Sequence, residues 1–340
     1  MARGWLDTQL LWHRAAPCPT ETRSTASSMR PFAIAPLLSL LLSLLLALIG
    51  ISAGTAHAQT PDSCRSTVTG DLRLHTLTST IFGNTRTIRV LLPDDYTVRG
   101  NEEKRYPVLY LLDGQNLFDA CLSDVSHREW QVDETVRRLT AAGRIPAMIV
   151  VGIDHAGRDR GHEFLPYADP FGGPPGREPI GKQWPRFVAT EVMPLLNGTY
   201  RTLLGPENTG LGGSSYGGVA TLHALVAAPR LAGYSLIEST PLWVGAGQVL
   251  RDTDPLATVF RRVWVGIGAI EAGGSGEFND LMLRLHRRLE SNFRAAGFDS
   301  TRMKMVVDPT GRHTEDAWAA RLPAALEYLF ADWTPPRSPQ

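Results

Sequence analysis

A glycine-rich heptapeptide in the second half of the chain, GGSSYGG at residues 212–218, has the spacing of a nucleophile elbow. In this G-x-S-x-G pattern the serine sits on a strained turn between a strand and a helix, and the glycines two positions away avoid collisions. Residues 209–213 can form the strand, and the apolar residues 216–228 favour a helix that stops before Pro229. This setting predicts Ser215 as a nucleophile; the alternative is a glycine-rich loop with an incidental serine.

A serine hydroxyl is a poor nucleophile at neutral pH and needs a general base beside it. After an elbow serine, the acid and then the histidine follow along the chain. His313 lies in a turn directly after a predicted strand at 302–308, where a loop reaches over the carboxyl edge of the sheet. His223, on the helix after the elbow, and His286, in the charged HRR segment of a long helix, fit this role less well. We therefore expect His313 to be the base.

The third member of such a site is an acid that follows a strand between the serine and the histidine. Glu271 lies just past the predicted strand 262–268. A carboxylate there can accept the histidine Nδ1–H, which fixes the tautomer and stabilises the imidazolium. Glu277 and Asp280 are rivals in the first turn of the next helix, where acids also suit the helix dipole, and Asp308 is a further rival beside the histidine turn.

Acyl transfer also needs two donors aimed at the developing oxyanion. The backbone N–H of Tyr216, directly after the nucleophile, is one. The second is expected in the loop after the third strand, where the sequence reads LDGQN at 112–116, and the N–H of Gln115 is the natural donor. Gly114 allows the backbone to approach closely. We expect Asp113 to pin this loop by side-chain hydrogen bonds rather than to act as the catalytic acid.

Strands alternate with helices along most of the chain, which predicts an α/β fold with a mainly parallel central sheet and helices on both faces. The first two strands alternate apolar and polar residues and are expected to form an antiparallel pair at the sheet edge. The strands are expected at 72–80, 85–92, 106–112, 147–153, 209–213, 234–238, 262–268 and 302–308, and the helices at 132–142, 184–197, 216–228, 278–296 and 315–330.

Residues 154–181 break this pattern, because they have no periodicity and contain the segment GGPPG. A loop this long inside a compact domain is usually functional. We interpret it as a lid or rim over the site. It belongs to a single domain that spans residues 59–340.

The beginning of the chain reads as a targeting segment. In residues 29–58 a positively charged start precedes a leucine-rich run, and the small-x-small motif Ala56-His57-Ala58 closes it. This predicts a secretory signal peptide cleaved after Ala58, and hence a secreted or periplasmic protein. An uncleaved membrane anchor is the alternative. Residues 1–28, with mixed charge, are expected to be a non-native extension from an early start codon.

The chain carries 34 basic and 34 acidic residues. A chain with this charge balance lacks the basic surface that would attract nucleic acid or an anionic membrane, so neither is an expected partner. Cys64 and Cys121 follow the predicted cleavage site; a disulfide and two free thiols are both compatible with the sequence. No metal-ligand spacing is present and no cofactor is expected. The expected partner is a small-molecule ester.

Several segments together resemble a known family. They are LYLLDGQNLF at 109–118, GGSSYGG at 212–218, ESTPLWV at 238–244, the strand end at 268–271 and Gly311-Arg312-His313. These resemble the putative esterase family that includes esterase D, feruloyl esterases, secreted mycolyltransferases and ferric-siderophore trilactone esterases, over residues 80–333. The resemblance implies an α/β-hydrolase fold and cofactor-free ester hydrolysis through an acylated Ser215. It is closest to the siderophore-esterase branch, in which some members work as a serine–histidine dyad, so the role of Glu271 stays open.

Candidate substrate contacts come from the same resemblance. Arg158 and Glu163 are similar to an R-x-x-E-Y element of that branch, with a longer spacing here; they either orient a polar substrate or form a salt bridge that shapes the loop. Asn116 is a further candidate contact in the oxyanion loop. The tryptophans that fit either an aryl-binding cleft or the core are Trp130, Trp184 and Trp243.

These features favour a secreted serine carboxylesterase. An acyltransferase of the mycolyl type is the second hypothesis, and a non-catalytic binding protein on a hydrolase scaffold is the third.

Overall fold

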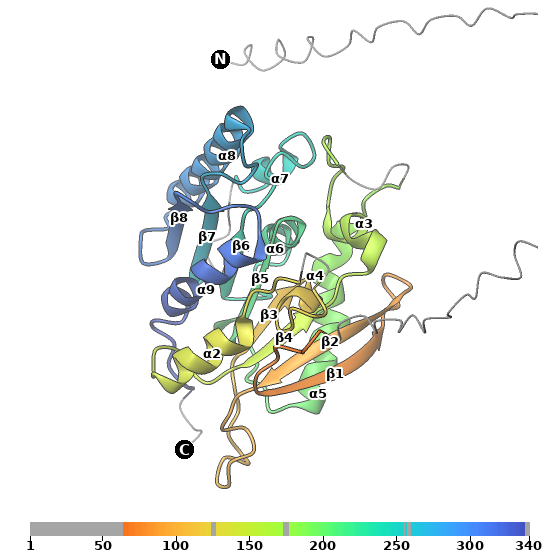
Figure 1. Ribbon diagram of the computed structural model, residues 1–340, viewed down its shortest axis with the longest axis vertical. Coiled ribbons are helices and arrows are strands. Elements are labelled where there is room, and N and C mark those ends of the chain that lie inside the picture. Colours follow the sequence, from red (N-terminus) through yellow and green to blue (C-terminus); the bar gives the residue numbers. More distant parts are fainter. Residues whose placement is uncertain (1–63, 124–126, 173–176, 255, 257–259, 337–340) are drawn as a thin grey trace, which may run out of the picture. The chain divides into compact units, whose positions relative to one another are not determined.

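The computed structural model describes residues 64–123, 127–172, 177–254, 256 and 260–336 (Figure 1). An eight-stranded sheet in the order β1-β2-β4-β3-β5-β6-β7-β8 organises this part of the chain. The strands are β1 (Asp71–Thr78), β2 (Thr85–Leu92), β3 (Val108–Leu112), β4 (Ile149–Ile153), β5 (Thr209–Ser214), β6 (Tyr234–Glu238), β7 (Arg262–Gly268) and β8 (Met303–Asp308). The predicted signal peptide and the 1–28 extension lie outside the described residues.

The sheet is mixed but mainly parallel. β2 runs antiparallel to both of its neighbours, β1 and β4, whereas all pairs from β4 to β8 are parallel. The antiparallel edge pair and the parallel remainder therefore confirm the predicted fold class. The carboxyl ends of β3, β5, β7 and β8 meet at one edge, the usual place for a site in an open α/β sheet.

Four of the five predicted helices are present as single α-helices, and shorter segments lie between them. The α-helices are α2 (Val132–Ala141), α3 (Arg160–Phe164), α4 (Trp184–Phe187), α5 (Met193–Thr199), α6 (Tyr216–Ala227), α7 (Gln248–Arg251), α8 (Gly276–Ala295) and α9 (Glu315–Leu329). The short 3-10 turns are η1 (Gly114–Asn116), η2 (Gly157–Asp159), η3 (Gly181–Gln183) and η5 (Pro206–Asn208), and η4 (Val188–Val192) is π-helical.

Helices cover both faces of the sheet, which explains the continuous apolar run of β3. Leu109 and Leu111 point to the face covered by α2 and α9, which lie side by side (Figure 1). Tyr110 and Leu112 point to the opposite face and pack with residues of α4, α5 and α6. Because side chains alternate along a strand, a strand buried on both faces shows no polar positions.

Two predictions about helices need correction. Residues 184–197 do not form one α-helix, because Pro194 has no N–H to donate to Thr190 and the chain takes a π-helical turn just before it. His286 does not lie on a charged face of α8. It is fully buried, and its Nδ1 lies 2.9 Å from the Met282 carbonyl oxygen.

The segment 154–181, predicted as a lid or rim loop without periodicity, contains η2 and α3 and ends at the start of η3, while residues 173–176 lie outside the described part. At the other end of the chain, Cys64 and Cys121 form a disulfide, which decides between the two alternatives that the sequence left open. Among the described residues, no helix is both long and apolar enough to cross a membrane.

Candidate active site

Ser215 sits at the junction between β5 and α6 in a strained backbone conformation, with φ 54° and ψ −127°. Its N–H donates to the Glu238 carbonyl oxygen at 3.0 Å, which ties the turn to β6. A Cβ atom on Gly213 would lie 2.8 Å from the carbonyl carbon of Gly217, so the two glycines of the pattern approach one another across the turn. The close approach, together with the positive φ of Ser215, explains the G-x-S-x-G spacing.

His313 and Glu271 form the hydrogen bond that the sequence suggested. His313 Nδ1 and Glu271 Oε2 are 2.7 Å apart, and because an ionised carboxylate can only accept, Nδ1–H donates. Burial alone would raise the pKa of Glu271, but the bonds from His313, Ser239 and Gly268 outweigh it and hold the pKa below its ordinary value. The carboxylate is therefore charged at neutral pH, and His313 Nε2 is left as an acceptor.

The second oxygen of Glu271 is held as firmly as the first. Oε1 accepts from the Ser239 hydroxyl and from the Gly268 N–H, both at 2.6 Å. The Ser239 hydroxyl itself accepts from Trp318 Nε1 at 2.8 Å. Sequence reasoning missed Ser239 as part of the site, although it lies in the ESTPLWV segment that carried the family resemblance.

A buried ion pair lies beneath this network. Arg321 donates to Glu238 Oε2 through Nε at 2.9 Å and Nη2 at 2.7 Å, and Trp264 Nε1 donates to Oε1 at 2.9 Å. The pKa of Glu238 is raised by burial, against which Arg321 acts. Because the Glu238 carbonyl holds Ser215 and the next residue is Ser239, this pair supports both halves of the site.

One cavity of about 340 Å³ brings the three predicted residues together: Ser215, Glu271 and His313 all line it. Its other walls are mostly apolar and come from Phe171, Pro241, Trp243, Phe278 and Met282. The predicted nucleophile, base and acid therefore line one cavity, although they lie far apart in the sequence.

Asp169 organises the wall of this cavity. Its Oδ2 accepts from the Tyr216 hydroxyl at 2.8 Å, and its Oδ1 accepts from Trp243 Nε1 and the Phe171 N–H, both at 2.9 Å. Burial, together with the bond to Asp169, raises the pKa of Tyr216. No sequence pattern indicated Asp169, which lies in the segment predicted as a rim.

The predicted oxyanion loop is η1, directly after β3. Asp113 adopts φ 58° and binds Arg160 through two bonds, Oδ1 to Nε at 2.7 Å and Oδ2 to Nη2 at 2.8 Å, so it pins the loop. A Cβ on Gly114 would lie 2.6 Å from the carboxylate of Asp154, which requires glycine. Both predicted donors follow strand ends at the site's edge. Tyr216 lines the cavity, whereas the described lining does not include Gln115.

Other predicted contacts lie elsewhere. Glu163 is buried and pairs with Arg86 Nη2 at 2.6 Å, while Arg158 is exposed in η2, so the Arg158–Glu163 salt bridge, one of the two alternatives, is wrong. Arg86 of β2 thus satisfies the Glu163 carboxylate inside the core.

Asn116 is buried in η1 and is not among the described lining residues of the cavity. Of the three candidate tryptophans, Trp130 and Trp184 belong to the core and Trp243 lines the cavity.

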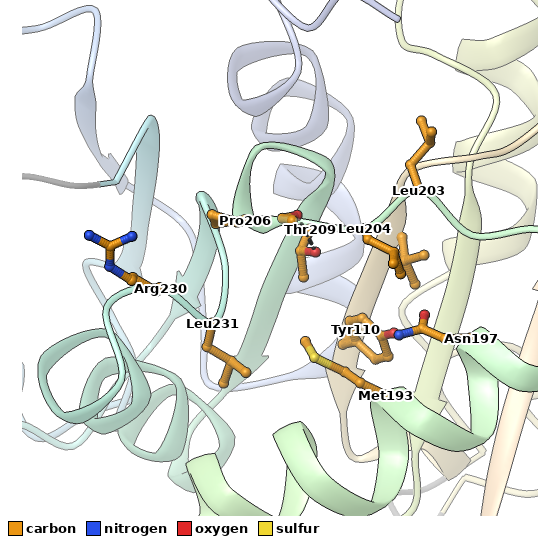
Figure 2. Close-up of a pocket in the computed structure, with 11 residues that line it drawn as sticks. Tyr110, Met193, Asn197, Leu203, Leu204, Pro206, Thr209, Arg230 and Leu231 are labelled. Atoms are coloured by element: carbon orange, nitrogen blue, oxygen red, sulfur yellow. Dashed lines mark hydrogen bonds between the residues drawn. The ribbon is translucent and has the colours of Figure 1, made fainter. Parts of the chain in front are cut away.

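A second, smaller pocket of about 150 Å³ lies at the opposite ends of β3 and β5, near Val108 and Thr209 (Figure 2). Met193, Leu204 and Leu231 contribute apolar walls. Among its described lining residues there is no histidine or acid to pair with a nucleophile, so the chemistry belongs to the cavity at Ser215.

Comparison with known proteins decides the family. Residues 79–329 match the family described as "Putative esterase". The chain belongs to this family. The "Uncharacterized protein YbbA" of Bacillus subtilis is 21% identical over 256 residues, which cover 73% of this chain and 93% of that protein.

Solved structures share the fold of this esterase-family chain. An IroE-like serine hydrolase from Shewanella oneidensis has a TM-score of 0.62 at 18% identity, covering 78% of this chain and 82% of its own. The siderophore hydrolase EstA from Aspergillus nidulans has a TM-score of 0.58 at 19% identity, covering 74% and 92%. The family resemblance and the α/β-hydrolase fold predicted from sequence are thus confirmed.

Proposed function

We propose that this protein is a secreted serine carboxylesterase that cleaves its substrate through an acyl-enzyme intermediate. One observation carries the proposal: Ser215, on its strained turn, lines the same cavity as His313, whose Nδ1 is held by the buried Glu271. A nucleophile, a base and a group that orients the base are the parts that acyl transfer by serine requires. Membership of the esterase family supports the same reaction class.

In this mechanism His313 Nε2 takes the proton of the Ser215 hydroxyl while the oxygen attacks the ester carbonyl. Glu271 stabilises the imidazolium that forms. The N–H groups of Tyr216 and Gln115 donate to the tetrahedral oxyanion. The imidazolium then protonates the departing alcohol, and the same base activates a water molecule that releases the acid and restores Ser215.

The walls of the cavity support an aryl or other apolar acyl ester as substrate, with a siderophore trilactone as a specific candidate. Trp243 lies 5.9 Å from the ring centre of Phe171 and 5.0 Å from that of Phe278, which makes a continuous aromatic wall. Such a wall favours flat, apolar groups. The solved siderophore hydrolase with the same fold is consistent with this choice.

Secretion is part of the proposal. The predicted signal peptide at 29–58 would direct the chain out of the cytoplasm, and the Cys64–Cys121 disulfide suits an oxidising compartment. N-terminal sequencing of the protein exported by a bacterial host tests this directly. A mature chain beginning at Gln59 supports cleavage after Ala58, and a retained leader in a membrane fraction contradicts it.

The test of the activity is turnover of p-nitrophenyl acetate and butyrate by the wild type and by Ser215→Ala. Loss of turnover in the variant supports the proposal, and equal background rates in both proteins contradict every enzymatic role. A panel of acyl chain lengths, feruloyl esters and catecholate trilactones then ranks substrates. Formation of a new ester in the presence of an added alcohol would assign the chain to the acyltransferases instead.

A further inference from the structure

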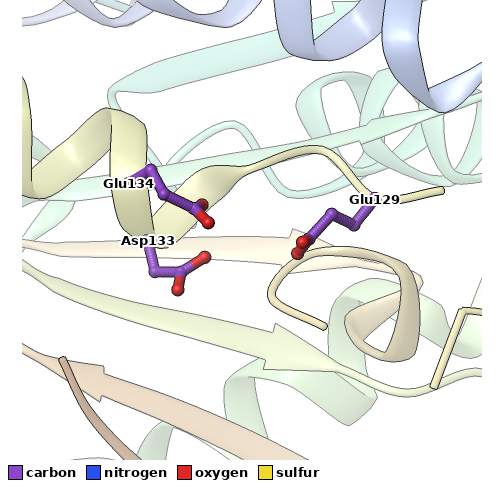
Figure 3. Close-up of side chains that lie close together, drawn as sticks. All are labelled: Glu129, Asp133 and Glu134. Atoms are coloured by element: carbon purple, nitrogen blue, oxygen red, sulfur yellow. The ribbon is translucent and has the colours of Figure 1, made fainter. Parts of the chain in front are cut away.

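Three acidic side chains gather away from the active site, at the start of α2. Glu129 precedes the helix, and Asp133 and Glu134 lie in its first turn. Each offers a carboxylate oxygen within 4.8 Å of the others, and Figure 3 shows the three carboxylates pointing toward one another. Asp133 is 0% exposed and Glu129 is 6% exposed. Acids at a helix start are common, but they are usually in water.

Each of these side chains has a buried oxygen without a protein partner. Glu129 Oε1 accepts from the Thr67 hydroxyl at 2.5 Å, and Asp133 Oδ2 accepts from the Thr69 N–H at 2.5 Å. The remaining oxygens, Glu129 Oε2, Asp133 Oδ1 and Glu134 Oε2, are buried and have no hydrogen-bond partner among the described residues. Buried polar atoms are nearly always paired, so oxygens without partners on three side chains whose carboxylates lie within 4.8 Å of one another indicate a ligand.

Arginines adjoining the cluster in sequence are bound to other acids. Arg128 pairs with Asp316 at 2.7 Å, and Arg137 donates to Asp94 at 2.8 Å. The hydrogen bond to Asp94 is the main cause of the raised pKa of Arg137. Carboxylates within 4.8 Å of one another repel when more than one of them is ionised, and a positive charge between them would remove that repulsion.

We propose that Glu129, Asp133 and Glu134 bind a calcium ion. The donor set consists of carboxylate oxygens, without the nitrogen or sulfur that zinc and other transition metals prefer. Calcium accepts about six to eight oxygens in flexible geometry, so clustered carboxylates that can bind through one or both oxygens suit it better than magnesium, which demands a near-ideal octahedron. A divalent charge would also offset most of the negative charge of the cluster.

The position of the cluster gives the ion a structural role. Thr67 and Thr69 belong to the N-terminal arm, which the Cys64–Cys121 disulfide attaches to the loop after η1. On the other side, the Trp130 N–H donates to the Asn116 carbonyl oxygen at 3.0 Å. A calcium ion would therefore join the arm to the segment that supports η1, the predicted oxyanion loop.

Thermal unfolding of the purified protein tests the proposal. After removal of metals with EDTA, Tm is measured against added calcium chloride at neutral pH. Ligand that binds only the native state stabilises it by mass action, so at a calcium concentration about a hundredfold above Kd we expect Tm to rise by roughly 5–10 °C. Glu134→Gln should reduce this shift strongly. Glu103→Gln, which removes one exposed acid outside the cluster, should leave the shift unchanged.

Terbium luminescence is a second measurement that uses only the wild type. Trp130 follows Glu129 directly and can sensitise a terbium ion bound in the cluster, so emission on tryptophan excitation should appear and should fall when calcium is added. A wild-type Tm that calcium does not change, with no displaceable terbium emission, overturns the proposal. A higher Tm of Glu134→Gln in EDTA with no calcium response in either protein also overturns it, because the cluster then holds a shared proton.

Discussion

The active site and the acidic cluster both bury glutamates, and they do so in opposite ways. Burial raises the pKa of a carboxyl group in either place, because it penalises the charged form. Around Glu271, three donors on His313, Ser239 and Gly268 outweigh burial, and the pKa falls. Around Glu134 the neighbours are other acids, and the pKa rises to about 7.

The comparison shows that partners, rather than depth, decide what a buried acid can do. Glu271 is charged and immobile, which is what a group that orients a catalytic histidine needs. In the cluster at α2, burial disfavours the ionised carboxylates, and each residue has a carboxylate oxygen without a hydrogen-bond partner. Both features suit a site that binds a cation.

Loss of the Ser215 hydroxyl should have the largest effect. In Ser215→Ala, His313 and Glu271 stay in place but have no nucleophile to serve, so we expect kcat to fall by about 10⁴-fold or more. Hydrolysis of p-nitrophenyl butyrate under saturating substrate measures this. Ser291→Ala, the same change at an exposed position of α8, is the control and should keep the wild-type rate. A Ser215→Ala rate within tenfold of the wild type would contradict the assignment of the nucleophile.

Loss of the charge at Glu271 should come next. In Glu271→Gln the amide can donate to His313 Nδ1 and stabilise the wrong tautomer, so kcat/KM should fall by about 10²- to 10⁴-fold. Glu277→Gln removes the rival acid in the first turn of α8 and should change kcat/KM by less than about twofold, because Glu277 is exposed and makes no bond to the histidine in the described network. Equal, small effects in both variants would indicate a serine–histidine dyad.

Removal of the Ser239 hydroxyl should have a moderate effect. Ser239 positions Glu271 without lining the cavity, and a lost bond to a charged group costs about 1.5–3 kcal/mol, so kcat/KM should fall roughly tenfold or more. With one donor fewer, Glu271 stabilises the imidazolium more, and the acid limb of the kcat/KM profile should move to higher pH.

The control for this variant distinguishes the loss of the hydroxyl from an effect of backbone strain at residue 239. Ser239 has a positive φ of 47°, which glycine adopts without strain. Ser239→Gly and Ser239→Ala should therefore lose activity to a similar degree and shift the pH profile in the same direction. A glycine variant with wild-type kinetics would show that the hydroxyl is dispensable.

The elements that carry the catalytic residues were predictable because their signals are local. Buried strands are short apolar runs, and β6 and β7 were predicted with the residues that the structure gives them. The turn glycines, the strand ends and the order of Ser215, Glu271 and His313 follow from the same patterns. Local pattern and tertiary structure agree here because parallel strands bring their carboxyl ends to one edge.

The contacts that hold these residues were not predictable, since they join distant segments without any periodic signal. Asp169 binds Trp243 across 74 positions, and Arg86 binds Glu163 across 77. Sequence reasoning chose Arg158 for the rim, whereas Arg160, two positions later, holds the oxyanion loop. No sequence pattern indicated the acids at the start of α2, two of which accept hydrogen bonds from Thr67 and Thr69 of the N-terminal arm.

The pH dependence of stability should show the smallest effect and separates the two kinds of acid. An acid whose pKa is raised on folding stabilises the protein below its unfolded value and loses that contribution as pH rises through its folded value. For Glu134 this window runs from the ordinary 4.5 to about 7. Glu271, with a lowered pKa, keeps its contribution over most of this window and begins to lose it only as pH falls toward the ordinary 4.5 and below.

Buried His286 acts in the opposite direction, because burial lowers its pKa from 6.5 to about 4 and its contribution grows as pH rises through that range. The absolute Tm therefore mixes both groups, and the difference between Glu134→Gln and the wild type isolates the cluster. In EDTA this difference should increase from pH 4.5 to pH 8 and reach roughly 2–5 °C in favour of the variant. With calcium present it should reverse, because the wild type then gains an ion that the variant holds weakly; a difference independent of pH and calcium would refute the contrast between the two sites.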